Sequence, residues 1–175
     1  MNGLRTTPME NKEESRLILS IGSNENDKKA HLKQAISKIK ELIGDIIKIS
    51  NIYESPSWGF DSNSFYNQSI LCATKLDMHA CLSRIKDIEK ELGRKTKTKS
   101  NTYQNRPIDI DIIFNDQFVI KSDELTIPHY LFHKRRFVLA PTQEIIPDFT
   151  PPGFQLNISQ ILDSCEDKSL CEIVE

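Results

Sequence analysis

Short apolar runs along this chain are typical of buried β-strands. Each is rich in isoleucine, leucine or other strand-forming residues, and turn-forming residues follow it, as Gly22-Ser23-Asn24 follow the first run. We expect the second and third strands to pair antiparallel across a long polar connection. The apolar runs span residues 16–21, 46–53, 65–74 and 108–114.

Longer segments carry apolar residues three or four positions apart, which is the spacing of one helix face. This pattern predicts helices over 29–43 and 76–92, each followed by a glycine that ends it. A further helical stretch is expected from Tyr130 to Thr142, and a short packed helix around Ile158. Phe118 to Ile120 is a candidate strand that could pair with the 108–114 run.

The order β-α-β-β-α-β predicts the ferredoxin-like split motif, an α+β fold in which helices cover an antiparallel sheet. Residues 1–15 are polar and indicate a loose N-terminal tail. We expect one domain over 16–175, with a C-terminal extension beyond the core. Many unrelated activities use this topology, so the fold alone does not indicate a function.

Composition narrows the class of protein. The formal net charge of −2 argues against a general nucleic-acid binder, so affinity for phosphate must come from local clusters. The chain has no apolar run of the roughly 20 residues needed to cross a membrane, and residues 1–15 lack the apolar stretch of a secretory signal. None of the four cysteines forms a C-x-x-C pair. We therefore expect a cytoplasmic protein without zinc.

Asp109 and Asp111 lie two residues apart within an apolar, β-branched segment. Residues at this spacing in a strand point to the same face, about 6–7 Å apart. Two carboxylates so close repel each other unless something cationic lies between them. Two Mg²⁺ ions, as in metal-assisted displacement at phosphorus, would fit. The alternative is a solvated edge strand that happens to carry two aspartates.

Two basic segments flank this strand. Between Gly93 and Pro107 there are five cations and no acidic residue, which indicates either a solvated linker or a cationic lid over a polyphosphate. Downstream, Pro128-His129-Tyr130 precede His133 to Arg136, a density of imidazole, phenol and guanidinium groups that suits phosphate oxygens. A single histidine in such a place is more often structural, and the basic residues that follow favour a functional role.

Phosphate-binding glycine motifs are absent from the sequence. There is no G-x-x-x-x-G-K-[ST] loop and no kinase-type glycine-rich loop. A bound nucleotide would therefore have to be held by side-chain cations and metal ions.

Taken together, these segments resemble the 6-hydroxymethyl-7,8-dihydropterin pyrophosphokinase family of folate biosynthesis, from about Leu17 to Phe149. Two departures are visible: Tyr103-Gln104-Asn105 replace the usual tryptophan-glycine-proline run, and Thr96 replaces a second arginine. The matching pieces are Ile18–Asn24, Tyr53–Pro56, Phe65–Asn67, Ile88–Arg94, Arg106–Ile112 and Pro128–Tyr130 with Arg135 and Phe137.

The resemblance implies transfer of the terminal diphosphate of ATP to a reduced pterin, with ATP as co-substrate. Separately, we expect the chain to be a monomer. Asp109 and Asp111 would hold two Mg²⁺ ions, and Arg94 and Arg106 would act as lid cations in the transition state. The other implied contacts are ATP-binding residues (Glu89, Lys97, Ile112, His129, Tyr130 and Arg135) and pterin-binding residues (Ser55, Pro56, Trp58, Phe65, Asn67 and Phe137). A catalytically silent ferredoxin-like module that binds a nucleotide or RNA is the alternative.

Overall fold

The structure is a computed structural model that describes residues 13–93 and 105–174. Its main sheet has the order β5-β1-β4-β3-β8, with β2 also paired to β4, and these strands pair antiparallel. The predicted ferredoxin-like fold is therefore confirmed. The strands of this sheet are β1 (Ser15–Ser23), β2 (Asp45–Ile49), β3 (Tyr53–Ser55), β4 (Phe65–Thr74), β5 (Asp109–Asn115) and β8 (Glu172–Ile173).

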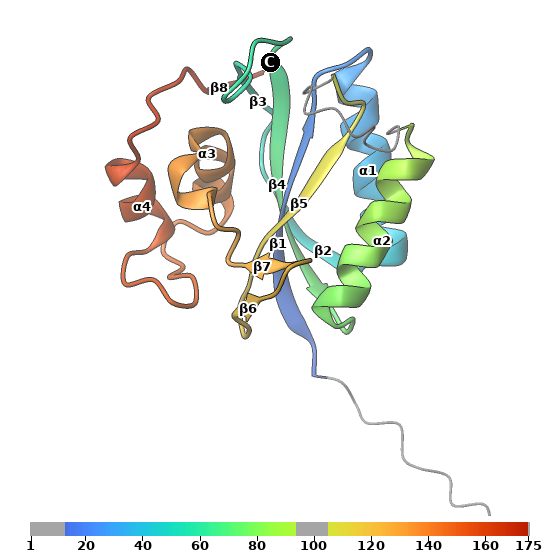
Figure 1. The fold of residues 1–175 in the computed structure, drawn as a ribbon, viewed down its shortest axis with the longest axis vertical. Helices are drawn as coiled ribbons and strands as arrows, with labels where there is room; N and C mark the ends of the chain where they lie inside the picture. Colours follow the sequence, from blue (N-terminus) through green and yellow to red (C-terminus); the bar gives the residue numbers. More distant parts are fainter. Residues whose placement is uncertain (1–12, 94–104, 175) are drawn as a thin grey trace, which may run out of the picture.

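Helices cover both faces of the sheet (Figure 1). On one face lie α1 (Lys28–Leu42) and α2 (Met78–Glu91), and on the other lie α3 (Arg136–Ile145) and α4 (Ile158–Ser164). The carboxylates of Asp27 and Asp77 accept hydrogen bonds from backbone N–H groups in the first turns of α1 and α2, which fixes where each helix begins. Within the described residues, no helix is long and apolar enough to span a membrane.

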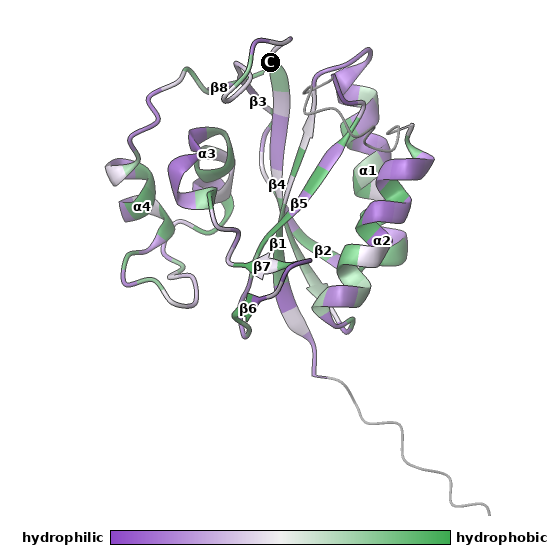
Figure 2. Ribbon diagram, viewed as in Figure 1, coloured by the Kyte–Doolittle hydropathy of each residue, from purple (hydrophilic) through white to green (hydrophobic). Residues whose placement is uncertain are grey.

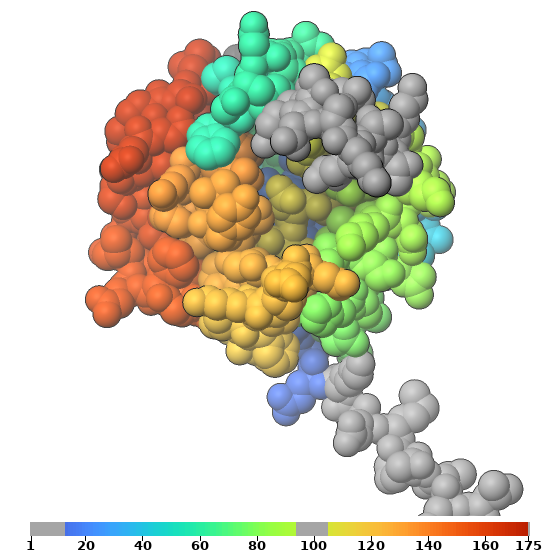
Figure 3. All heavy atoms as spheres, in the orientation of Figure 1, coloured from blue at the N-terminus to red at the C-terminus, as the bar shows by residue number. Residues whose placement is uncertain are grey.

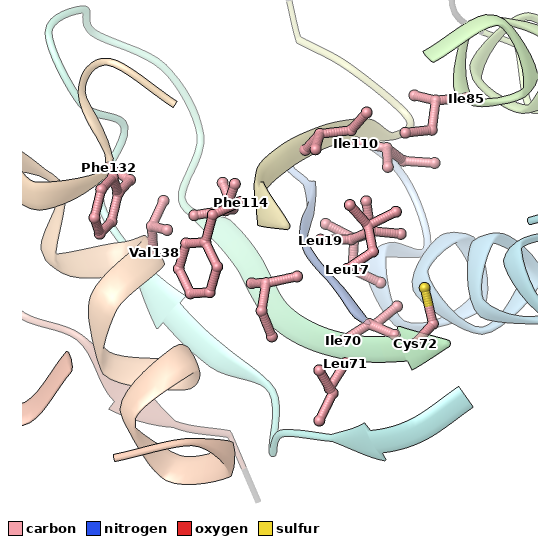
Figure 4. Packing of buried hydrophobic residues seen from close by; sticks show 14 of the residues in the cluster. Leu17, Leu19, Ile70, Leu71, Cys72, Ile85, Ile110, Phe114, Phe132 and Val138 are labelled. Carbon is pink, nitrogen blue, oxygen red and sulfur yellow. The ribbon is translucent and has the colours of Figure 1, made fainter. Parts of the chain in front are cut away.

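The core has two halves because the central strands are buried on both faces. Leu17, Leu19 and Cys72 point from the sheet toward α1 and α2, while Phe114 lies on the side of α3 (Figure 4). The hydropathy colouring agrees, since apolar residues concentrate on the helix faces turned toward the sheet (Figure 2). Phe114 packs against Phe132 and Phe149, with ring centroids 5.8 and 5.4 Å away, and so anchors the second half.

The strand predicted over 46–53 is wrong in its extent. The structure has two strands, β2 and β3, separated by Ser50 to Ile52. At Ser50 the side-chain oxygen accepts from the backbone N–H of Ser69, and its carbonyl accepts from Gln68, so the chain remains attached to β4 while it changes direction. These bonds come from a distant part of the sequence, which local pattern does not reveal.

The predicted pairing of Phe118–Ile120 with the aspartate strand is also wrong. Ile120–Lys121 forms β6, which pairs with β7 (Thr126–Ile127) in a separate two-stranded sheet, and Phe118 and Val119 are exposed. β1 already occupies one side of β5, and Asp116 bonds to Arg16 of β1 through both its side chain and its backbone.

Three boundaries differ from those expected. Ser15, assigned to the tail, is the buried first residue of β1 and accepts from Asn115. Gly22 and Ser23, expected in a turn, complete that strand. The helix expected from Tyr130 begins at Arg136, after the short 3₁₀ helix η1 (Phe132–Lys134), because Arg135 is extended.

Candidate active site

Asp109 and Asp111 occupy alternate positions of β5, which is an edge strand of the main sheet. Asp109 is registered with Gly22 and Asp111 with Ser20 on β1, so both carboxylates belong to one face, while Ile110 between them is buried. They line a cleft of about 270 Å³ together with residues of α2 and the segment before α3. The space-filling view shows β5 at the bottom of a hollow between α2 and α3 (Figure 3).

Arg106 and Glu89 lie directly against this pair of carboxylates. Arg106 donates from Nη1 to Oδ2 of Asp109 at 3.1 Å. Glu89 of α2 is buried, and its Oε1 accepts the backbone N–H of Ile110 at 2.8 Å. Helix α2 therefore reaches the backbone between the two aspartates and holds the strand that presents them.

His129 lines the same cleft as the two carboxylates. Burial and the nearby guanidinium of Arg135 lower its pKa to about 4, although Asp109 acts in the opposite direction. The imidazole is therefore neutral at pH 7. Its Nδ1 accepts from the backbone N–H of Leu131 at 3.2 Å, which leaves the proton on Nε2 as a hydrogen-bond donor.

Arg135 contributes a guanidinium group that is oriented by aromatic rings. Its Cζ lies 4.9 Å from the ring centre of Trp58 and 5.7 Å from that of Phe137. Its Nε is buried, and within the described residues it has no hydrogen-bond partner. Buried donors are normally satisfied, so this guanidinium is suited to receive an anionic acceptor.

A second group of predicted residues lies beside the amino end of β5, around Gly22. Ser55 and Asn67 are buried and joined by a hydrogen bond of 2.9 Å from Asn67 Nδ2 to Ser55 Oγ. A Cβ atom at Gly22 would lie 3.1 Å from Asn67 Oδ1 and 3.5 Å from Phe65, so glycine permits this close approach. Since Gly22 is registered with Asp109, these groups adjoin the carboxylate face.

Asn24 is a buried residue that was not among the predicted site residues. Its Oδ1 accepts from the backbone N–H of Arg106 at 2.7 Å, and its Nδ2 donates to Ser62 and Asn105. It therefore links the loop after β3 to the residues that precede the aspartates. In the sequence, Asn24 stands out only as part of the Gly-Ser-Asn run, within the piece Ile18–Asn24 that resembles the family.

Not every predicted site residue is brought into the cleft by its side chain. The side chain of Ile112 is buried in the core, so only its backbone could meet a ligand. Tyr130 is exposed and stacks on His129 with ring centroids 5.0 Å apart, and Pro56 is exposed. Arg94 and Lys97 lie outside the described residues.

Comparisons with known proteins agree on one family. The model of the 7,8-dihydro-6-hydroxymethylpterin-pyrophosphokinase (HPPK) family matches residues 18–147. The 2-amino-4-hydroxy-6-hydroxymethyldihydropteridine pyrophosphokinase of Aquifex aeolicus is 35% identical over 160 residues, covering 91% of this chain and 98% of that protein. The enzyme of the same name from Porphyromonas gingivalis is 34% identical over 137 residues, covering 77% of this chain and 93% of that protein.

Solved structures show the same fold. Wild-type Plasmodium falciparum HPPK-DHPS with STZ-DHP superposes with a TM-score of 0.72 at 16% identity, over 88% of this chain. This chain spans only 44% of that longer protein. At this identity the likeness concerns the fold alone.

Proposed function

Because the chain belongs to the 7,8-dihydro-6-hydroxymethylpterin-pyrophosphokinase family, we propose a role for each residue of the cleft in that family's reaction. The enzyme transfers diphosphate from ATP to the hydroxymethyl group of 6-hydroxymethyl-7,8-dihydropterin, in folate synthesis. The pterin oxygen forms a bond to the β-phosphorus, the bond from that phosphorus to the α–β bridging oxygen breaks, and AMP leaves. The hydroxyl proton is released to water.

Asp109 and Asp111 would hold magnesium, with two ions as the expected number. The donor set fits this metal, because Mg²⁺ binds through one or two carboxylates and completes its coordination with substrate phosphates and water. Both carboxylates belong to one face of β5 and line the cleft. When bound, the metal would neutralise part of the negative charge of the phosphates. The observation that carries this proposal is the meeting of both aspartates with Arg106, His129 and Arg135 in a single cleft.

His129 and Arg135 would bind the phosphates of ATP. The neutral imidazole offers an Nε2–H donor, and the guanidinium offers donors held in place by Trp58 and Phe137. Tyr130, stacked on His129, would add a hydroxyl at the entrance. Glu89 would act by fixing the strand beside the nucleotide.

Ile112 would contribute to nucleotide binding through its backbone. It follows Ile110 by two residues, and the N–H of Ile110 points away from β1 toward Glu89. The backbone groups of Ile112 therefore face the same outer side of β5, where a base could pair with them.

The pterin would lie beside Gly22, where Asn67 and Ser55 present polar groups and Phe65 presents a ring. A planar heterocycle with several donors and acceptors suits an aromatic wall with an amide at its edge. Phe137 would form the facing wall, and Pro56 and Trp58 would border the pocket. This arrangement adjoins Asp109 through the register of Gly22, which would bring the hydroxymethyl group near the metal ligands.

Arg106 would act on the transferring group. Its guanidinium pairs with Asp109, so a metal ion on that carboxylate would compete with it and leave it available for a phosphate oxygen. Cations that stabilise the negative charge developing in the transition state accelerate the chemical step more than they tighten substrate binding. We propose the same role for Arg94 and an ATP contact for Lys97.

We also propose that the chain acts as a monomer in the cytoplasm. All four cysteines are free thiols, as expected in a reducing compartment. Sedimentation velocity of the full chain tests the oligomeric state.

The test of the function is formation of AMP from ATP with and without the reduced pterin. We expect AMP only when pterin and Mg²⁺ are both present, with loss of the signal on chelation by EDTA and recovery on adding Mg²⁺. Nucleotide binding without pterin-dependent AMP would instead identify a catalytically silent module. Equal rates with EDTA would refute the metal assignment alone.

A further inference from the structure

We infer that residues 165–174, here called the C-terminal strap, hold both walls of the substrate site, with Asp167 positioning Arg135. The inference rests on the proposed function, because it concerns how that site is shaped. The strap lies beyond residues 18–147, which the family model matches. It runs from the end of α4 to β8 and connects α3 with β3 (Figure 1).

Asp167 joins the strap to the first residue of α3. Its Oδ2 accepts the backbone N–H of Arg136 at 3.0 Å. Its Oδ1 accepts the backbone N–H of Ser169 at 2.9 Å and also bonds to the Ser169 hydroxyl. With both oxygens engaged, the carboxylate is held in one orientation.

Helix α3 depends on this acceptor because its own N-cap residue does not provide one. Arg135 stands at the N-cap, and its side chain makes no capping hydrogen bond. An N-cap is usually Ser, Thr, Asp or Asn, whose side chain satisfies an N–H in the first turn. Here a carboxylate 31 residues later in the chain satisfies the first N–H, and its charge also complements the positive end of the helix.

The position of this bond links it to the site. Arg136 lies between Arg135 and Phe137, the two residues that we assign to phosphate and pterin binding. The backbone at Arg136 therefore sets the direction of both side chains. Releasing it would allow Arg135 to leave Trp58, whose ring centre is 4.9 Å away.

The other end of the strap holds the opposite wall. Glu172 and Ile173 of β8 pair with Glu54 and Tyr53 of β3, and the N–H of Val174 donates to the carbonyl of Ile52 at 2.8 Å. The next residue of β3 is Ser55, which accepts the hydrogen bond from Asn67. A three-residue strand has few bonds of its own, so an added partner restricts its motion.

The strap is attached at several points. Before it, α4 packs on α3, with Ile158, Ile161 and Leu162 buried. Cys165 at the start of the strap is also buried. In contrast, Leu170 is exposed, so the middle of the strap adds little to the core. Its attachments at the start of α3 and at β3 add to the direct contacts that α3 makes with β3 and β4.

The experiment compares Asp167→Ala, Asp167→Asn and Glu166→Ala in the full chain. We expect Asp167→Ala to lower kcat/KM for ATP by about three- to tenfold, mainly through KM. The reason is that α3 loses the acceptor for its first N–H, so Arg135 is held less firmly. Asp167→Asn keeps an oxygen for Arg136 and should stay within about twofold of wild type. Glu166 is an exposed neighbour, so Glu166→Ala should match wild type.

A double-mutant cycle separates positioning from general stability. If Asp167 acts through Arg135, then Asp167→Ala should change KM for ATP by less than about twofold when Arg135 is already alanine. Fully additive losses would overturn the inference, as would a wild-type KM for Asp167→Ala. Urea unfolding of each variant shows that the kinetics concern folded protein.

The outcomes also separate this inference from the proposed function. If the wild-type chain forms no pterin-dependent AMP, then the proposed function fails. If the wild type is active and Asp167→Ala is kinetically unchanged, then only the strap inference fails.

Discussion

Replacing His129 by asparagine should remove a specific part of the acid sensitivity of folding. Burial and the charge of Arg135 lower the pKa of the imidazole from 6.5 to about 4. Between these values the unfolded chain binds a proton that the folded chain does not, so acidification favours unfolding. A group whose pKa is lowered in this way supports stability above pH 6.5 and loses that support as the pH falls toward 4.

The magnitude follows from the two pKa values. One such site loses about 2 kcal/mol of unfolding free energy between pH 7 and pH 5. His129 is only partly buried, and solvent screening reduces the effect to about 1 kcal/mol. His133, whose pKa burial also lowers, is present in both proteins, so its contribution cancels in the comparison.

The assay is urea unfolding of wild type and His129→Asn at pH 7 and pH 5, at constant ionic strength. Asparagine is chosen because its amide oxygen can accept the backbone N–H of Leu131 in place of Nδ1. Wild type should lose about 1 kcal/mol more on acidification than the variant. His79→Asn, at an exposed position of α2, should behave like wild type. Equal losses in wild type and His129→Asn would refute the reasoning.

Three further predictions concern the site and the core. Asp111→Ala should reduce Mg²⁺-dependent AMP formation by orders of magnitude while urea unfolding stays cooperative. Near-full activity would contradict the metal assignment, and Asp45→Ala at an exposed position is the control. Arg106→Ala should lower the single-turnover rate far more than the affinity for ATP, whereas equal losses in both would make Arg106 a simple binding residue. Phe114→Ala should lower the free energy of unfolding in urea by about 3–5 kcal/mol, because Phe114 is fully buried. Phe118→Ala, at an exposed position, should lower it little, and similar losses for the two variants would contradict the assigned core.

Local pattern predicted the regular part of the fold well. The strand expected over 65–74 has those bounds in the structure, and α1 and α2 begin and end close to the expected residues. In each of these segments the spacing of apolar residues is regular, and characteristic residues mark where the segment ends. The error at 46–53 has a different origin, since the backbone of Asn51 donates to Glu144, which lies 93 residues away. A contact of that kind leaves no trace in the surrounding sequence.

The same distinction applies to the site. Arg106, Asp109 and Asp111 are neighbours in sequence, and strand geometry alone places the two aspartates on one face. The roles of Asn24 and Asp167 depend on partners 82 and 31 residues away, so no motif predicts them. Contacts that hold the proposed site residues in position are therefore harder to find from sequence than the residues themselves.

The two interpretations of the aspartates, edge strand and proposed metal site, are compatible. β5 is the last strand of its sheet, so the backbone groups on its outer side need other partners. Glu89 takes the N–H of Ile110, and the N–H of His129 donates to the carbonyl of Ile113 at 2.7 Å. The bonds that satisfy this edge thus bring Glu89 and His129 beside the carboxylates. Because β5 is an edge strand, its outer backbone groups bond to the residues that complete the cleft.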